Sequence, residues 1–442
     1  MIRCVVYNIS EQQLISVYGA TNTKATKALA MVFADLDTNQ INHLKVDGFT
    51  VKEVKDVSIH PTVGPIIPIP GLNTYTPEQL FDYVGLTSLR TITNPPLYGK
   101  NMNIALIDTG MRETHQLLSG HIIFRMNFTA DPMEDGYDHG TGTASIITTV
   151  APQAGILNMK VLDNSGNGTE EEVALGIDYC ITMITINPSL APSVLNISLG
   201  TADLGDPDSP LRVACRAAIA EGMVVIAAAG NGGPGYNTIM SPACDPQVIA
   251  VGSCNVTDHA VSYFSSRGPT LEGAIKPDCV LFGENIVVAS AASDTAVSAK
   301  SGTSFAAPLA SCMALLSQEG IIRLVSYSGG VPLGLQPSAL SQTLTNSKLL
   351  NTYLPKVTVK PVANSTSTTT PSTTKDNDYG YGLPFGTLIT QEINPASNLN
   401  ISGLIGFMLV MMMMKMMMGM MSNMNQPKQV SQPRKQLTGF GI

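Results

Sequence analysis

Between about residues 103 and 316, short apolar runs alternate with longer stretches in which apolar residues recur at helical spacing. The runs have the length of strands and are apolar at consecutive positions, which indicates strands buried on both faces. Strands are predicted at residues 104–107, 156–162, 194–197, 224–229 and 248–251, with helices between them at residues 169–184 and 210–221. This order predicts an α/β fold with a doubly wound, mostly parallel central sheet flanked by helices.

The first part of the chain predicts a small α+β unit. It has an apolar strand at residues 3–9, a helix at residues 25–36 and alternating segments at residues 49–54 and 57–60. The Pro-rich stretch 61–70 cannot continue a helix or a central strand, so it predicts a linker. We therefore expect one domain with its linker at residues 1–75 and a larger domain at residues 76–393.

A run of Ser and Thr residues lies near the end of the larger domain. Residues 364–375 are polar and of low complexity, and such a segment buries too little apolar surface to fold by itself. We expect a flexible loop over residues 361–376.

The tail, residues 394–442, is rich in Met. Within it, residues 401–421 are apolar over about the length of a membrane span, with the single charge Lys415. A membrane anchor is the first interpretation, and the basic residues Lys428, Arg434 and Lys435 would place the C-terminus in the cytoplasm and the rest outside it. An interfacial or partner-binding helix and a Cu(I) site are the alternatives.

Composition narrows the class of protein. The 442 residues include 25 basic and 33 acidic ones, a net charge of −8 without long runs of either sign, which argues against nucleic acid as a partner. The seven cysteines form no metal-type spacing, and Cys180, Cys215 and Cys312 lie in apolar helical stretches, as small core residues do. The apolar run before Glu11 is too short for a signal peptide.

Four polar residues follow strands or precede helices in the larger domain. Asp108 closes an apolar strand, and Asn231 follows another between two glycines. His139 precedes small residues that open an apolar helical stretch at 144–150, and Ser304 precedes one at 309–316. One sheet edge could gather all four. Taken singly, each has an ordinary structural interpretation, as a turn residue, a loop residue or a helix cap.

Taken together and in this order, the four segments resemble the subtilisin family of serine peptidases. The resemblance covers roughly residues 98–320, and Tyr379-Gly-Tyr-Gly-Leu resembles the segment that closes the family's catalytic domain. Other matching stretches are residues 150–154, 159–163, 196–200, 248–252 and 264–269. The resemblance implies that Asp108, His139 and Ser304 form a catalytic triad and that Asn231 completes the oxyanion hole.

The implied reaction is peptide hydrolysis through an acyl-enzyme on Ser304, with His139 as general base and Asp108 as its orienting group. It requires no cofactor. Structural calcium is frequent in the family, although no ligands are assigned in this chain. The resemblance also implies substrate-binding residues that are small and uncharged, which predicts cleavage after large apolar or aromatic residues and not after Arg or Lys. These residues are Ser198, Leu199, Gly200, Ala228, Ala229 and Gly230.

The first unit has the position and length of the family's inhibitory propeptide, and a plain accessory domain is the alternative. The chain departs from the family pattern at Gly142, where a second histidine is usual, at Phe305, where Met is common, and at residues 281–282, where Ala-Pro is frequent. None of these departures removes a reacting group.

The expected partners are polypeptide substrates, the chain's own N-terminal unit and, through the tail, a membrane. The anchored peptidase would lie outside the cytoplasm. A peptide-binding scaffold without activity is the main alternative function. An α/β-hydrolase esterase fits less well, because Gly-Thr-Ser-Phe-Ala around Ser304 is not G-x-S-x-G and the order of the residues differs.

Overall fold

The computed structural model describes residues 1–59, 74–328, 346–360, 374–384 and 388–389. Residues 1–397 belong to one compact unit. The predicted linker at 61–70, the Met-rich tail and nearly all of the Ser/Thr-rich segment lie outside the described residues.

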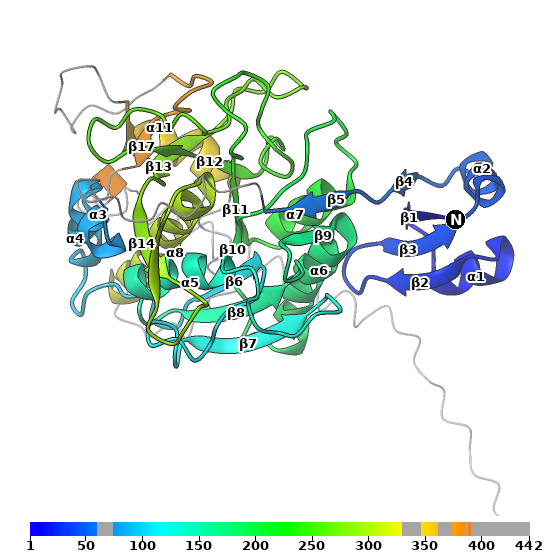
Figure 1. The fold of residues 1–442 in the computed structure, drawn as a ribbon, viewed down its shortest axis with the longest axis horizontal. Coiled ribbons are helices and arrows are strands. Elements are labelled where there is room, and N and C mark those ends of the chain that lie inside the picture. The colour runs from blue at the N-terminus through cyan, green and yellow to red at the C-terminus, as the bar shows by residue number, and fades with distance from the viewer. Residues whose placement is uncertain (60–73, 329–345, 361–373, 385–387, 390–442) are drawn as a thin grey trace, which may run out of the picture. The chain divides into compact units, whose positions relative to one another are not determined.

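The larger part of this unit is built on a seven-stranded sheet in which all neighbouring strands are parallel. The strand order is β13-β12-β11-β10-β6-β8-β7, and helices cover both faces (Figure 1). The predicted α/β class is therefore confirmed. The strands are β6 Asn103–Asp108, β7 Ile122–Asn127, β8 Gly155–Lys160, β10 Val194–Ile197, β11 Val224–Ala228, β12 Ile249–Cys254 and β13 Cys279–Phe282.

Two pairs of helices complete the layers. On one face, α6 (Glu170–Ile186) and α7 (Pro210–Ala220) pack against each other over alternate residues of the strands. The other pair is α5 (Gly140–Val150) and α8 (Thr303–Ser328). The strand order reverses between β6 and β10, and in open parallel sheets ligands bind at the carboxyl ends of the strands beside such a reversal.

The remaining elements of this part are short, and they surround the sheet and its helices. They are α3 Pro77–Tyr83, α4 Leu86–Arg90, β9 Asn167–Thr169, β14 Ile286–Ala289, β15 Val297–Lys300, α10 Asn346–Lys348, η2 Leu349–Tyr353, α11 Leu354–Val357, β16 Thr358–Val359 and β17 Leu383–Pro384.

Within the described part of the chain, one helix is long and apolar enough to cross a membrane, the segment Thr303–Leu324 of α8. The 18-residue window that passes this test is 94% buried inside the protein, as expected for a central core helix. All seven cysteines are buried and unpaired, which confirms Cys180, Cys215 and Cys312 as core residues. Burial raises the pKa of their thiols.

The N-terminal unit is a four-stranded antiparallel sheet in the order β2-β3-β1-β4, with two helices. The predicted small α+β unit is thus confirmed. Its elements are β1 Ile2–Tyr7, α1 Glu11–Tyr18, β2 Thr21–Ala25, β3 Met31–Leu36, α2 Thr38–Val46, β4 Val51–Glu53 and the outlying strand β5 Asp56–Ser58.

The helix predicted at residues 25–36 is wrong, because residues 31–36 form the inner strand β3. Met31 and Phe33 belong to the core shared with α6 and the main sheet, whereas Val32, Ala34 and Leu36 belong to a separate core within the N-terminal unit. A strand buried on both faces loses the alternation of polar and apolar residues, so its sequence cannot be told from a buried helix by periodicity.

Candidate active site

Asp108 is the last residue of β6 and is buried at the carboxyl edge of the sheet. Its Oδ1 accepts the Thr109 backbone N–H at 2.7 Å, and its Oδ2 accepts the Thr143 hydroxyl at 3.1 Å. These donors hold the carboxylate in one orientation and stabilise its charge. The side chain therefore faces α5 and its preceding turn.

His139 is the N-cap residue of α5, but its side chain makes no capping hydrogen bond. Instead, its Nδ1 lies 2.7 Å from Asp108 Oδ1. Because a carboxylate only accepts, this contact assigns the ring proton to Nδ1 and leaves Nε2 as the acceptor. Nε2 is buried and has no hydrogen-bond partner among the described residues.

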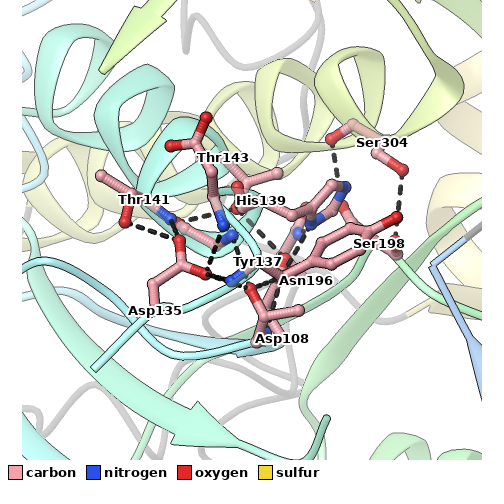
Figure 2. Close-up of polar contacts among 12 residues, drawn as sticks. Asp108, Asp135, Tyr137, His139, Thr141, Thr143, Asn196, Ser198 and Ser304 are labelled. Carbon is pink, nitrogen blue, oxygen red and sulfur yellow. Dashed lines mark hydrogen bonds and ion pairs between the residues drawn. The ribbon is translucent and has the colours of Figure 1, made fainter. Parts of the chain in front are cut away.

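Ser304 is the second residue of α8 and is buried. Its hydroxyl donates to the Ser198 carbonyl at 3.2 Å, and the Ser198 hydroxyl donates to the Ser304 carbonyl at 3.1 Å. Figure 2 shows that Asp108, His139 and Ser304 come together from three different elements. The Phe305 ring lies 5.6 Å from the His139 ring, centroid to centroid, so the start of α8 packs against the imidazole.

Ser304 and His139 lie in the same site (Figure 2). Among the contacts of the described residues, no hydrogen bond joins them. The Ser304 hydroxyl is bonded to the Ser198 carbonyl instead, and His139 Nε2 has no partner among the described residues. Catalytic hydrogen bonds are often loose in an enzyme without substrate and tighten when substrate binds.

Asn231 is held in one orientation by the residue before Ser304. Its Oδ1 accepts both the backbone N–H of Thr303 at 2.9 Å and the Thr303 hydroxyl at 3.0 Å. Its Nδ2 is buried without a hydrogen-bond partner among the described residues. A buried, unsatisfied donor costs about 1–3 kcal/mol, which is recovered when an acceptor arrives. At the start of α8, the Thr303 N–H is bonded to Asn231 and the Phe305 N–H to the Gly302 carbonyl at 3.0 Å, which leaves the Ser304 N–H as the second donor.

Changing Asn231 to Asp removes this donor and adds a negative charge beside the expected oxyanion, while aspartate keeps an acceptor for Thr303. If Nδ2 stabilises an oxyanion, kcat should fall by about 10²–10³-fold, as reported for the equivalent donor in subtilisin. KM should change little. Steady-state kinetics on a chromogenic peptide measures both. An unchanged kcat would exclude this role for Asn231.

Of the residues expected to bind substrate, Ser198 and Gly230 bond to the start of α8, the latter through its N–H to the Thr303 hydroxyl at 3.2 Å. Leu199 is buried, and so is the segment from Ala228, the last residue of β11, through Ala229 to Gly230, the residue before Asn231. The backbone N–H and C=O of Gly200 are both bonded to Ser58, at 3.2 and 3.1 Å. A cavity of about 330 Å³ opens beside Asn231 and is lined also by Ala202, Asp203, Gly232, Asn237, Thr238, Ile239 and Met240.

Sequence reasoning missed a buried carboxylate that supports the site, Asp135. Its Oδ1 accepts the Thr109 hydroxyl at 2.8 Å, and its Oδ2 accepts the Thr141 backbone N–H and hydroxyl at 2.8 and 2.6 Å (Figure 2). Lys160 lies nearby and donates to the Thr109 carbonyl at 2.5 Å, and burial lowers the pKa of this ammonium group. The available signal was an acidic residue four positions before His139.

Two departures from the family pattern, Gly142 and Phe305, are neighbours in space. A Cβ atom at Gly142 would lie 3.0 Å from Val288 Cγ2 and 3.3 Å from Phe305 Cε1. The absence of a side chain at residue 142 therefore makes room for the larger ring at residue 305.

We accordingly expect Gly142→His to lower the free energy of unfolding by about 1–3 kcal/mol through overpacking. The double variant Gly142→His, Phe305→Met should recover a large part of that loss. Urea unfolding of Gly142→His, of Phe305→Met and of the double variant gives the coupling energy between the two positions. Strictly additive effects would show that the two positions are independent.

Among the residues that the structure describes, no group of three or more His, Cys, Asp and Glu side chains could hold a metal ion. An acid, an imidazole with a free Nε2 and a hydroxyl at a helix N-terminus form the kind of arrangement that Ser-His-Asp hydrolases use.

The subtilase family model matches residues 99–382, which is more than half of the chain, so the chain belongs to the subtilase family. Serine protease AprX of Bacillus subtilis (strain 168) is 35% identical over 214 residues, covering 43% of this chain and 48% of that protein. Subtilisin-like protease 1 of Trichophyton tonsurans is 33% identical over 230 residues, covering 50% and 43%. The chain thus spans about half the length of the curated relatives it matches.

Proposed function

We propose that the chain is a serine endopeptidase that hydrolyses polypeptides through an acyl-enzyme. The observation that carries the proposal is the buried pair of Asp108 and His139, whose free Nε2 lies in the same site as Ser304. The unpaired Nδ2 of Asn231 adds a donor where negative charge would develop.

In the proposed mechanism, Ser304 leaves the Ser198 carbonyl and gives its proton to His139 Nε2 as Oγ attacks the scissile carbonyl carbon. Asp108 keeps the imidazole in the required tautomer and stabilises its cation. The Ser304 backbone N–H and Asn231 Nδ2 donate to the oxyanion. His139 then protonates the leaving amine, and water, activated by the same imidazole, hydrolyses the ester.

Hydrolysis of unfolded casein by the purified chain, after the N-terminal unit has been released, tests this function. We expect cleavage that a serine-directed phosphonate abolishes and that a chelator leaves unchanged in rate, since no step uses a metal. A chain that binds casein peptides without cutting them would instead favour the inactive scaffold.

For the residue before the cleaved bond, we propose a preference for large apolar or aromatic side chains. The expected lining residues are small and uncharged, and Met240, which lies against Gly230, lines the neighbouring cavity beside Asn231. The same cavity has one charged residue, Asp203. Its two oxygens accept backbone N–H groups of Gly205 at 2.9 Å and Leu271 at 3.1 Å, so the protein itself provides donors for this carboxylate.

A peptide library cleaved by the wild type and by Asp203→Asn separates the two specificities. Dominant cleavage after Phe, Tyr, Leu or Met in both proteins supports the apolar pocket. Cleavage after Lys or Arg that disappears in Asp203→Asn would show that the pocket selects cations.

We propose that the N-terminal unit is an inhibitory propeptide and the whole chain a zymogen. The support is that β5 pairs antiparallel with β9 and that Ser58 then occupies the backbone groups of Gly200, which a substrate strand would use. The contact with α6 is specific. Asp178 accepts the N–H groups of Lys27, Ala28 and Leu29 at 2.8, 2.6 and 2.9 Å.

We also propose that the Met-rich tail anchors the protein in a membrane with the peptidase outside the cytoplasm. The support is the apolar stretch 401–421 and the basic residues after it. A carbonate wash of membranes should leave the full chain in the pellet, whereas release into the supernatant would indicate a peripheral helix.

A further inference from the structure

The residue before His139 has an uncommon backbone conformation. Asp138 has a φ of +69°, in the left-handed region, which Asp tolerates better than most residues with a side chain. Its backbone N–H donates to Asp135 Oδ1 at 2.9 Å. The turn that presents His139 is thus held from its own side by Asp135.

The same turn is held from the opposite side by Lys300. The Lys300 Nζ lies 2.8 Å from Asp138 Oδ2 and also donates to the Asp138 backbone carbonyl. The second carboxylate oxygen of Asp138 accepts the N–H of Ala291. The Lys300 side chain is only 11% exposed, so this ion pair is well shielded from water on the lysine side.

Lys300 is the last residue of β15 and lies four residues before Ser304. In the hairpin it is paired with Ile286 of β14. One ammonium group therefore binds both the main chain and the side chain of the residue before His139, and it does so from the strand that leads into the start of α8. The pair of Asp138 and Lys300 joins the two segments that carry the base and the nucleophile.

We infer that Asp138 and Lys300 are positioning residues for the peptidase reaction, which set the approach of His139 to Ser304. This inference rests on the proposed function. Misplacement of a reacting group by about 1 Å can cost about 10²-fold in rate. Separating the turn from the strand should therefore lower kcat while substrate binding, which uses other residues, is retained.

The pair also carries two opposite charges close to the imidazole. Other charged residues around the His139 turn are Asp108, Glu134, Asp135 and Lys160, with the pair of Arg112 and Asp294 beyond Thr141. The first residues of α5 and α8 next to the imidazole carry no charge. Removing only one member of the pair leaves its partner's charge uncompensated near His139.

The two single variants should shift the pH dependence of kcat/KM in opposite directions. Asp138→Asn leaves an extra positive charge, which disfavours the imidazolium and moves the acidic limb of the kcat/KM profile to lower pH. Lys300→Met leaves an extra negative charge and moves that limb to higher pH. At a partly solvated site we expect shifts of about half a pH unit. The double variant should return to the wild-type pH profile and keep a reduced kcat.

The experiment measures kcat, KM and the pH profile for the released enzyme, with phosphonate titration of Ser304 to count active sites. The variants are Asp138→Asn, Lys300→Met, their double and the conservative Lys300→Arg. Arg125→Met is the matched control. Arg125 lies on the edge strand β7 and its exposed side chain pairs with Glu113, so this variant also removes one cation from an ion pair. Thermal unfolding confirms that each variant is folded.

The expected result is a loss in kcat of about 10–100-fold in the two single variants, with KM within threefold. We also expect opposite pH shifts, substantial recovery in Lys300→Arg and wild-type kinetics in Arg125→Met. Folded single variants with wild-type kcat and pH profile would overturn the inference while leaving the proposed function intact. An inactive, unlabelled wild type would overturn the proposed function itself.

Discussion

Ser304→Ala is expected to lower kcat by about 10⁶-fold, the loss that removal of the nucleophile causes in subtilisin. In the proposed mechanism the Ser304 hydroxyl forms the acyl-enzyme, and in the structure it donates one hydrogen bond, to the Ser198 carbonyl at 3.2 Å. The residual activity would come from the remaining donors and from substrate binding.

The same variant tests the zymogen. If the chain removes its own N-terminal unit, Ser304→Ala should accumulate as the uncut full-length protein. Ser317→Ala is a matched control, because Ser317 is another buried serine of α8, and its hydroxyl donates to the Met313 carbonyl at 2.6 Å. N-terminal sequencing and casein hydrolysis measure both effects. Identical processing of Ser304→Ala and the wild type would show that another protease cuts the chain.

Asp108→Asn is expected to lower kcat by about 10⁴-fold with nearly unchanged geometry. The asparagine amide would present an N–H to His139 Nδ1 or lose the contact. The ring proton would then lie on Nε2, and in this tautomer Nε2 cannot accept the Ser304 proton. The Asp108 carboxylate also stabilises the imidazolium that forms in the transition state, and an amide cannot.

The matched control for this variant is Asp258→Asn, a change to a surface turn residue that accepts the Ala260 N–H at 2.9 Å. Burst kinetics with an ester substrate separates acylation from deacylation, and both should slow because His139 acts in each. A loss of less than tenfold in Asp108→Asn would mean that Asp108 only supports the fold.

Much of the sheet could be predicted because its strands are buried on both faces and end in recognisable polar residues. The apolar run into Asp108 is an example. The edge strand β7 was missed because the exposed Arg125 and the half-buried Asn127 interrupt its apolar pattern. The strand β3 was taken for a helix for the opposite reason, since two separate cores bury its two faces.

The site residues could be proposed from sequence because each lies at the end of a strand or the start of a helix. The contacts that hold these residues in place could not be predicted from sequence. Asp138 and Lys300 are 162 positions apart and meet only in the folded chain, and nothing in the local pattern marks their partnership. The direction of the Ser304 hydroxyl and the orientation of the Asn231 amide likewise depend on tertiary contacts with Ser198 and Thr303.

The most direct test of the central claim is to map the adduct of a serine-directed phosphonate on the released enzyme by mass spectrometry. A single adduct on Ser304 is predicted, formed in proportion to the loss of casein hydrolysis and abolished by His139→Ala. Continued hydrolysis without an adduct on Ser304, or an adduct on Ser304 that forms equally fast without His139, would contradict the account.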